Sequence, residues 1–94
     1  MSGDSKRARF RVDLRKCHSF GQAIKMAREK GGWTHQRISD LTGIPKQALV
    51  QYEKDSRCIS IENALKFEPI FHAEPADLLW RAEEDGKLAR GEYH

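Results

Sequence analysis

The segment from Thr34 to Glu53 constrains the fold of this chain more than any other part of the sequence. Apolar residues recur at helical spacing on both sides of Gly43, and glycine readily adopts the positive φ of a tight turn. They are Ile38 and Leu41 before the glycine, and Ala48, Leu49 and Tyr52 after it. Pro45 suits the first turn of a helix, where its missing N–H would be unpaired. The pattern predicts two short amphipathic helices joined by a sharp turn, as in a helix-turn-helix.

The outward positions of the second predicted helix are Lys46, Gln47 and Gln51. In a helix-turn-helix this helix lies in the major groove of DNA. Lysine can donate to O6 and N7 of guanine, and glutamine can make a two-pronged contact with adenine. Gln47 and Gln51 are four residues apart and therefore share a helix face. Such residues are also common on solvated surfaces, but the surrounding pattern favours base reading and predicts sequence-specific binding of double-stranded DNA.

The charge of the chain is unevenly distributed. The 94 residues are enough for one small domain with one core, and the net charge is +3. Residues 1–18 hold six Lys/Arg and two Asp (+4), residues 19–82 nine and eight (+1), and residues 83–94 two and four (−2). We therefore predict a basic arm, a DNA-binding domain and a polar C-terminal tail over these three ranges. This balance fits a polyanion-binding module better than an enzyme.

Residues 7–16 alternate between apolar and charged side chains. Ala8, Phe10, Val12 and Leu14 fall on one side, and Arg7, Arg9, Arg11, Asp13 and Arg15 on the other. A period of two predicts a half-buried strand, which needs a partner from the C-terminal segment or a second subunit. The alternative is a flexible basic arm whose Arg9 and Arg11 contact phosphates. An arginine stripe that only protects an edge from aggregation is equally compatible.

Capping signals divide the rest of the chain into helices. Ser19 with Gln22 forms a capping box, Gly31–Gly32 ends that helix, and Thr34 caps the next. Ser60 is expected to cap a helix that turns Ile61, Ala64, Leu65 and Phe67 inward, with a kink or an early end at Pro69. A short final helix from Pro75 contains Leu78, Leu79 and Trp80.

Catalytic and metal-binding patterns are weak. Cys17 and Cys58 are isolated and are expected to be reduced thiols. No ligand spacing joins them with His18 and His72 into a zinc site, and Cys17–His18 lacks a third group. No run of 18 apolar residues suggests a membrane span. We expect no enzyme activity, no cofactor, no metal and no membrane partner.

The sequence resembles the Xre/Cro-type helix-turn-helix regulators, which include the lambdoid phage repressors. The resemblance covers about residues 19–81 and is carried by Gly21, Ile24, Arg28, Thr34, Ile38, Gly43–Ile44, Tyr52–Glu53 and Leu78–Leu79. It implies an all-α, five-helix, lambda-repressor-like bundle that dimerises on pseudo-palindromic operators. It also implies base-reading roles for Lys46, Gln47 and Gln51.

The resemblance assigns further contacts. Thr34, His35 and Gln36 open the first helix of the motif beside a phosphate, where backbone N–H groups and the helix dipole favour an anion. Arg57 would touch the backbone of DNA from the following loop, and Arg28 would pair with Glu53. Two positions depart from the family: it prefers glutamine where this chain has His35, and a glycine near Asp55.

These observations lead to one hypothesis and two alternatives. We expect a homodimeric transcriptional repressor of phage, plasmid or mobile-element type, cytoplasmic and nucleoid-associated in a bacterium, with Leu78, Leu79 and Trp80 at the dimer interface. One alternative is an antitoxin that represses its own operon and masks a toxin with its N-terminal segment. The other is a protein–protein adapter that keeps the fold without binding DNA.

Overall fold

The structure is a computed structural model that describes residues 11–89, and this range is helical without a strand. The helices are α2 (Phe20–Gly31), α3 (His35–Thr42), α4 (Lys46–Glu53), α5 (Ile61–Leu65), α6 (Glu68–Phe71) and α7 (Pro75–Ala89). The predicted all-α class is confirmed. The described range contains six helical segments rather than five, because the helix expected after Ser60 is divided into α5 and α6.

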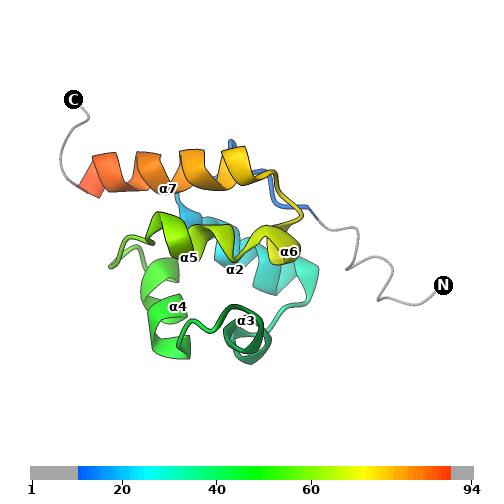
Figure 1. The fold of residues 1–94 in the computed structure, drawn as a ribbon. Helices are drawn as coiled ribbons and strands as arrows, with labels where there is room; N and C mark the ends of the chain where they lie inside the picture. Colours follow the sequence, from blue (N-terminus) through cyan, green and yellow to red (C-terminus); the bar gives the residue numbers. More distant parts are fainter. Residues whose placement is uncertain (1–10, 90–94) are drawn as a thin grey trace.

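The helices form a small bundle with α7 on one side and α3 and α4 on the opposite side (Figure 1). Helix α2 lies between them and packs against α4, α6 and α7. Three aromatic rings mark the centre of the core, Phe20, Phe67 and Phe71, with ring centroids 5.1–5.4 Å apart. The core thus joins the start of α2 to both ends of α6.

The predicted capping residues begin and end α2 and α3. The Ser19 hydroxyl accepts from the N–H of Gln22 at 3.0 Å, and the Thr34 hydroxyl accepts from the third residue of α3 at 3.1 Å. Gly32 and Gly43 follow α2 and α3 with φ of 80° and 76°. These left-handed conformations carry little steric penalty for glycine.

The helix boundary at Pro45 differs from the prediction, and the one at Pro69 agrees with it. Pro45 is the N-cap of α4 rather than its first residue, and its carbonyl accepts from the N–H of Leu49 at 3.2 Å. Pro69 lies at the start of α6, where a missing N–H is tolerated. The chain therefore ends α5 early and starts a new helix, which is one of the two outcomes expected at this proline.

The inward face predicted for α5 is only half right. Ala64 and Phe67 have no exposed surface, whereas Ile61 and Leu65 are 45% and 40% exposed. The helix is five residues long and packs on α7 along a single stripe, so its other apolar stripe stays at the surface.

The strand predicted within residues 7–16 is wrong for the part that the structure describes. Residues 11–16 form an extended stretch followed by a turn, with Val12 and Leu14 buried and the neighbouring Arg11, Asp13 and Arg15 exposed. The N–H of Val12 donates to the carbonyl of Phe71 at 3.2 Å, so the segment is fastened to α6 instead of to another strand. The alternating pattern therefore predicted correctly which of these side chains are buried, but not how the backbone is paired. Arg9 and the other residues of 1–10 lie outside the described range.

Helix α7 is longer than the short helix expected, and residues 83–89 belong to it instead of to a polar tail. Its Arg81 is 8% exposed and donates to the carbonyl of Cys17 at 2.7 Å. Arg81 also pairs with Asp85, whose carboxylate accepts from the first N–H of α2, that of Phe20, at 2.7 Å. None of the helices described is both long and apolar enough to cross a bilayer.

Candidate nucleic-acid interface

Helix α4 presents a polar face because its apolar face is buried against the rest of the domain. Ala48, Leu49 and Tyr52 are buried, while Lys46, Gln47 and Gln51 are exposed on the other side. The helix lies at the end of the bundle that is opposite α7 (Figure 1). The three side chains expected to read bases are thus available to a partner of this surface.

Local hydrogen bonds fix the turn between α3 and α4. The N–H of Gly43 donates to the carbonyl of Ser39 at 2.8 Å. The buried Thr42 hydroxyl donates to the carbonyl of Ile38 at 2.7 Å and accepts from the N–H of Ile44 at 3.2 Å. Sequence reasoning did not identify Thr42. Its only signal is a hydroxyl four residues after an apolar position, which can return a bond to the preceding helical turn.

Gly21 allows α2 to approach α4 more closely than any other residue could. A Cβ atom at this position would lie 1.7 Å from the carbonyl oxygen of Tyr52. Real Cβ contacts are essentially never shorter than 3.0 Å. The glycine that contributed to the family resemblance therefore has a physical role: it lets the backbone of α2 support the last turn of α4.

A cluster around Glu53 joins α2, α3 and α4. Arg28 donates to both carboxylate oxygens, from Nε and Nη2, at 2.8 Å each, and His35 Nε2 lies 2.8 Å from Oε2. The side chain of Glu53 is 10% exposed, and those of Arg28 and His35 are 27% exposed. Burial by itself raises the pKa of Glu53, but the hydrogen bonds from Arg28 and His35 outweigh it and bring the pKa below its usual value. The pKa of Arg28 is raised by the same pairing.

The side chain of His35, expected to contact a phosphate, instead contacts Glu53. Its ring is bonded to Glu53, so it acts as a bridge between the start of α3 and the end of α4. Sequence reasoning missed this partner, because the family resemblance placed a glutamine here and gave Glu53 only to Arg28. Nearby, the Gln36 amide donates to Asp40 at 2.7 Å on the exposed surface of α3. Thr34 is exposed and its hydroxyl is used as the N-cap.

Two arginines expected to contact phosphates lie in different places. Arg57 is in the loop after α4, where its Nη1 lies 3.4 Å from Gln51 Oε1 and its guanidinium stacks over Tyr52. Arg11 donates to the carbonyl of His72 at 3.0 Å, in the segment that runs along α7. Figure 1 shows this segment on the side of the bundle away from α3 and α4. The structure therefore gives Arg57 but not Arg11 a position beside the polar face of α4.

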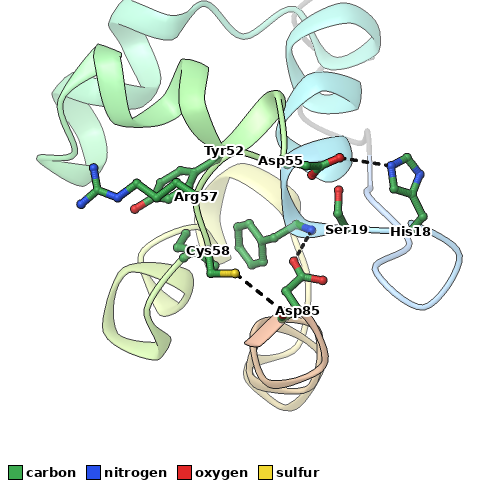
Figure 2. A pocket seen from close by; sticks show the side chains of 10 residues that line it. His18, Ser19, Tyr52, Asp55, Arg57, Cys58 and Asp85 are labelled. Carbon is green, nitrogen blue, oxygen red and sulfur yellow. Dashed lines mark hydrogen bonds and ion pairs between the residues drawn. The ribbon is translucent and has the colours of Figure 1, made fainter. Parts of the chain in front are cut away.

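A cavity of about 230 Å³ lies between the start of α2, the loop after α4 and α7 (Figure 2). His18 faces Asp55 across its rim at 3.6 Å, and the thiol of Cys58 lies 3.7 Å from the carbonyl of Asp85. Burial raises the pKa of Asp85, although the N–H of Phe20 and the charge of Arg81 act in the opposite direction. These contacts join three elements of the fold around the cavity.

Ser19, in the lining of this cavity, has a role in helix capping. The Ser19 hydroxyl accepts a hydrogen bond as the N-cap of α2 and is not paired with His18. Within residues 11–89, no group of three or more His, Cys, Asp or Glu side chains is placed to hold a metal ion.

The residues expected at a dimer interface differ in their availability. Leu78 has no exposed surface and is part of the core, so its predicted place at an interface is corrected. Trp80 is half-buried, with Arg15 and Arg81 stacked at 4.2 and 4.9 Å from its ring centroid. Leu79 is half-buried as well. These two remain candidates for contact with a second subunit.

Comparison with known proteins gives consistent matches. A helix-turn-helix family model matches residues 24–77. A candidate HTH-type transcriptional regulatory protein of Thermococcus gammatolerans is 36% identical over 75 residues, which are 77% of this chain and 23% of the relative. A protein of the same description from Thermococcus kodakarensis is 32% identical over 71 residues, 72% of this chain and 22% of the relative.

The chain spans less than a quarter of the length of these curated relatives. The relatives are archaeal, so they give no support to the bacterial or phage origin expected from the resemblance. No solved structure matches the chain.

Proposed function

Because this chain belongs to the helix-turn-helix family of Xre/Cro-type, lambda-repressor-like proteins, we propose that it is a transcriptional regulator that binds specific sequences of double-stranded DNA. The observation that carries the proposal is the two-sided character of α4. One face is buried against the bundle, and the other presents Lys46, Gln47 and Gln51 at the surface. A helix supported in this way can enter the major groove without disturbing the core.

In the proposed complex Lys46 and Gln47 have distinct chemical roles. Lys46 donates to O6 and N7 of guanine or to a phosphate, and Gln47 bonds the edge of a neighbouring base. The first backbone N–H groups of α3, at His35 and Gln36, precede the first hydrogen bond within that helix and point toward its N-terminal end. A phosphate there would be held by these donors and by the helix dipole. The cluster around Glu53 would keep this phosphate seat and the reading helix at a fixed angle.

We further propose that two copies bind together, with their α4 helices in successive major grooves about 34 Å apart. The surface available for the contact includes Leu79 and Trp80 on α7 and the exposed apolar pair Ile61 and Leu65 on α5. Helices α5 and α7 pack side by side, so these residues lie on neighbouring elements. Binding across a promoter would then repress transcription by occupying the site of the polymerase.

The antitoxin alternative loses part of its basis in this structure. It required a free N-terminal segment, and residues 11–18 of that segment include Val12, Leu14 and Cys17 in the core. Selection from a random DNA pool distinguishes a transcriptional regulator from a protein–protein adapter, because an adapter would enrich no DNA sequence.

The test is selection of bound DNA from a random pool, followed by affinity measurements on the enriched site. Lys46→Ala and Gln47→Ala should each weaken binding by roughly 5- to 150-fold, the effect of losing about 1–3 kcal/mol of base contact. Lys87→Ala is the matched control, since it removes a positive charge from α7 on the opposite side of the bundle. If both α4 variants bind the enriched site as tightly as the parent, the assigned reading face is wrong.

A further inference from the structure

The loop that follows α4 folds back onto the helix and is hydrogen-bonded to the backbone of Gln51. The N–H and the hydroxyl of Ser56 both donate to the carbonyl of Gln51, at 3.0 and 3.1 Å. Asp55 makes this return possible with a φ of 57°, near the position where the resemblance leads us to expect a glycine. The loop is thereby closed at the exposed end of α4, and the residue after Ser56 is held beside the side chain of Gln51.

That residue is Arg57, and it makes two contacts with α4. Its Nη1 lies 3.4 Å from Gln51 Oε1, and its guanidinium carbon lies 5.8 Å from the centroid of the Tyr52 ring. Tyr52 is 3% exposed, so its ring is a fixed surface on which the guanidinium can rest. Arg57 therefore lies over an aromatic ring, and its Nη1 is directed toward the amide of Gln51.

The chemistry of the two side chains decides which way the amide faces. A guanidinium carries only donors, so the end of the amide that turns toward it is the carbonyl oxygen. The NH₂ group then turns away from Arg57. The carbonyl oxygen has two lone pairs, and Arg57 uses one of them, so the discrimination comes from the direction of the oxygen and not from its saturation. A two-pronged contact with adenine needs the oxygen and the NH₂ group side by side on one base edge, whereas here the oxygen turns toward the loop. An amide that presents its NH₂ group is matched instead to acceptors: O6 and N7 of guanine, or O4 of thymine.

We propose that Arg57 is a positioning residue that sets the base preference of Gln51, by turning its amide into a donor that selects guanine or thymine over adenine. The inference rests on the proposed function, since it needs α4 in the major groove. It gives Arg57 a role in specificity beyond the phosphate contact expected from the sequence.

The experiment compares the sites that the parent and three variants select from a random DNA pool. Gln51→Ala identifies the base pair that Gln51 reads, because preference is lost at that position alone. Arg57→Met keeps an unbranched side chain but removes every donor. Lys54→Met is the matched control, since it removes a positive charge from the same exposed loop without touching the amide. Circular dichroism confirms that each variant is folded.

The parent is expected to enrich guanine or thymine at the identified position. Arg57→Met should shift that position toward adenine by roughly fivefold or more, the lower end of what one two-pronged contact discriminates. Lys54→Met should leave the base preference unchanged.

Three results would overturn the inference. The parent could enrich adenine there, or Arg57→Met could keep the preference of the parent and only weaken binding uniformly with a smaller dependence on salt, as loss of a phosphate contact does. A parent that enriches no sequence refutes the proposed function itself, and this outcome is distinct from the other two.

Discussion

Replacing Gly21 with alanine should destabilise the domain, even though alanine is the better helix former. The added Cβ would lie 1.7 Å from the carbonyl oxygen of Tyr52, whereas Cβ atoms in real structures essentially never lie within 3.0 Å of such an atom. Helices α2 and α4 must then separate by more than an ångström. The opposing atom belongs to the backbone, so no flexible side chain can move aside to relieve the contact.

The magnitude follows from what the separation disturbs. Overpacking a well-packed site typically costs about 1–3 kcal/mol. The carbonyl of Tyr52 also accepts from the N–H of Asp55 at 3.0 Å, and losing such a bond costs about 1 kcal/mol. Helix propensity returns at most about 1 kcal/mol in favour of alanine. We therefore expect Gly21→Ala to lower the free energy of unfolding by about 1–3 kcal/mol, a substantial part of the roughly 5–15 kcal/mol typical of a domain.

Gly43→Ala is the matched control, because its cost has a different origin. Gly43 has a φ of 76°, and a Cβ added there meets nothing within 4 Å. The left-handed conformation alone should cost about 1–2 kcal/mol, and Gly43→Asn should recover part of it, since asparagine tolerates this conformation. Urea denaturation followed by circular dichroism and by tryptophan fluorescence measures each value. A Gly21→Ala variant as stable as the parent, or more stable, would refute the close approach of α2 and α4.

Three further predictions concern the charged and thiol groups. Glu53→Gln should lower stability by about 3 kcal/mol near neutral pH, as expected when one partner of a largely buried pair is removed. Because the pKa of Glu53 is below its usual value in the folded state, the stabilisation it provides is present above the ordinary carboxyl pKa and is lost as pH falls through the folded pKa. Urea midpoints should therefore fall more steeply with acidification for the parent than for Glu53→Gln, and equal slopes would contradict the assignment. Asp85→Ala should lower the free energy of unfolding by about 2 kcal/mol or more in the same assay, since it removes a charged acceptor from the start of α2 and leaves the buried Arg81 without its carboxylate. An unchanged urea midpoint would show that Asp85 of α7 does not cap α2. Cys58 should react with an aromatic disulfide reagent in the folded protein, whereas Cys17 should react only on unfolding, because burial shields its thiol and raises its pKa; rapid reaction of both would disprove the burial.

The parts of the fold that could be predicted from the sequence are those governed by local chemistry. Ser19 and Thr34 cap helices because their hydroxyls reach backbone N–H groups three residues ahead. Gly43 ends α3 because the turn needs a positive φ. The burial of Val12 and Leu14 followed from the spacing of apolar residues. Each of these signals lies within a few residues of the structure it specifies.

The parts that the sequence did not predict depend on contacts between distant residues. Nothing near Asp85 indicates that its carboxylate accepts from an N–H 65 residues earlier, and without that contact the end of α7 looked like a tail. The partner of His35 is 18 residues away on another helix. Periodicity also left open which apolar stripe of α5 is buried, and that depends on where α7 lies. At the candidate interface, the exposed set on α4 could be predicted, but the contact of Arg57 with Gln51 could not.

The paired contacts of Arg81 and Asp85 have a practical consequence for handling the protein. They attach α7 to the segment just before α2 and to its first turn, and α2 in turn lies directly behind α4. A fusion partner or surface tether joined rigidly to the end of α7 would thus pull on the support of the helix proposed to read DNA. A flexible spacer at that junction should relieve this mechanical coupling, so binding assays on immobilised protein ought to include one.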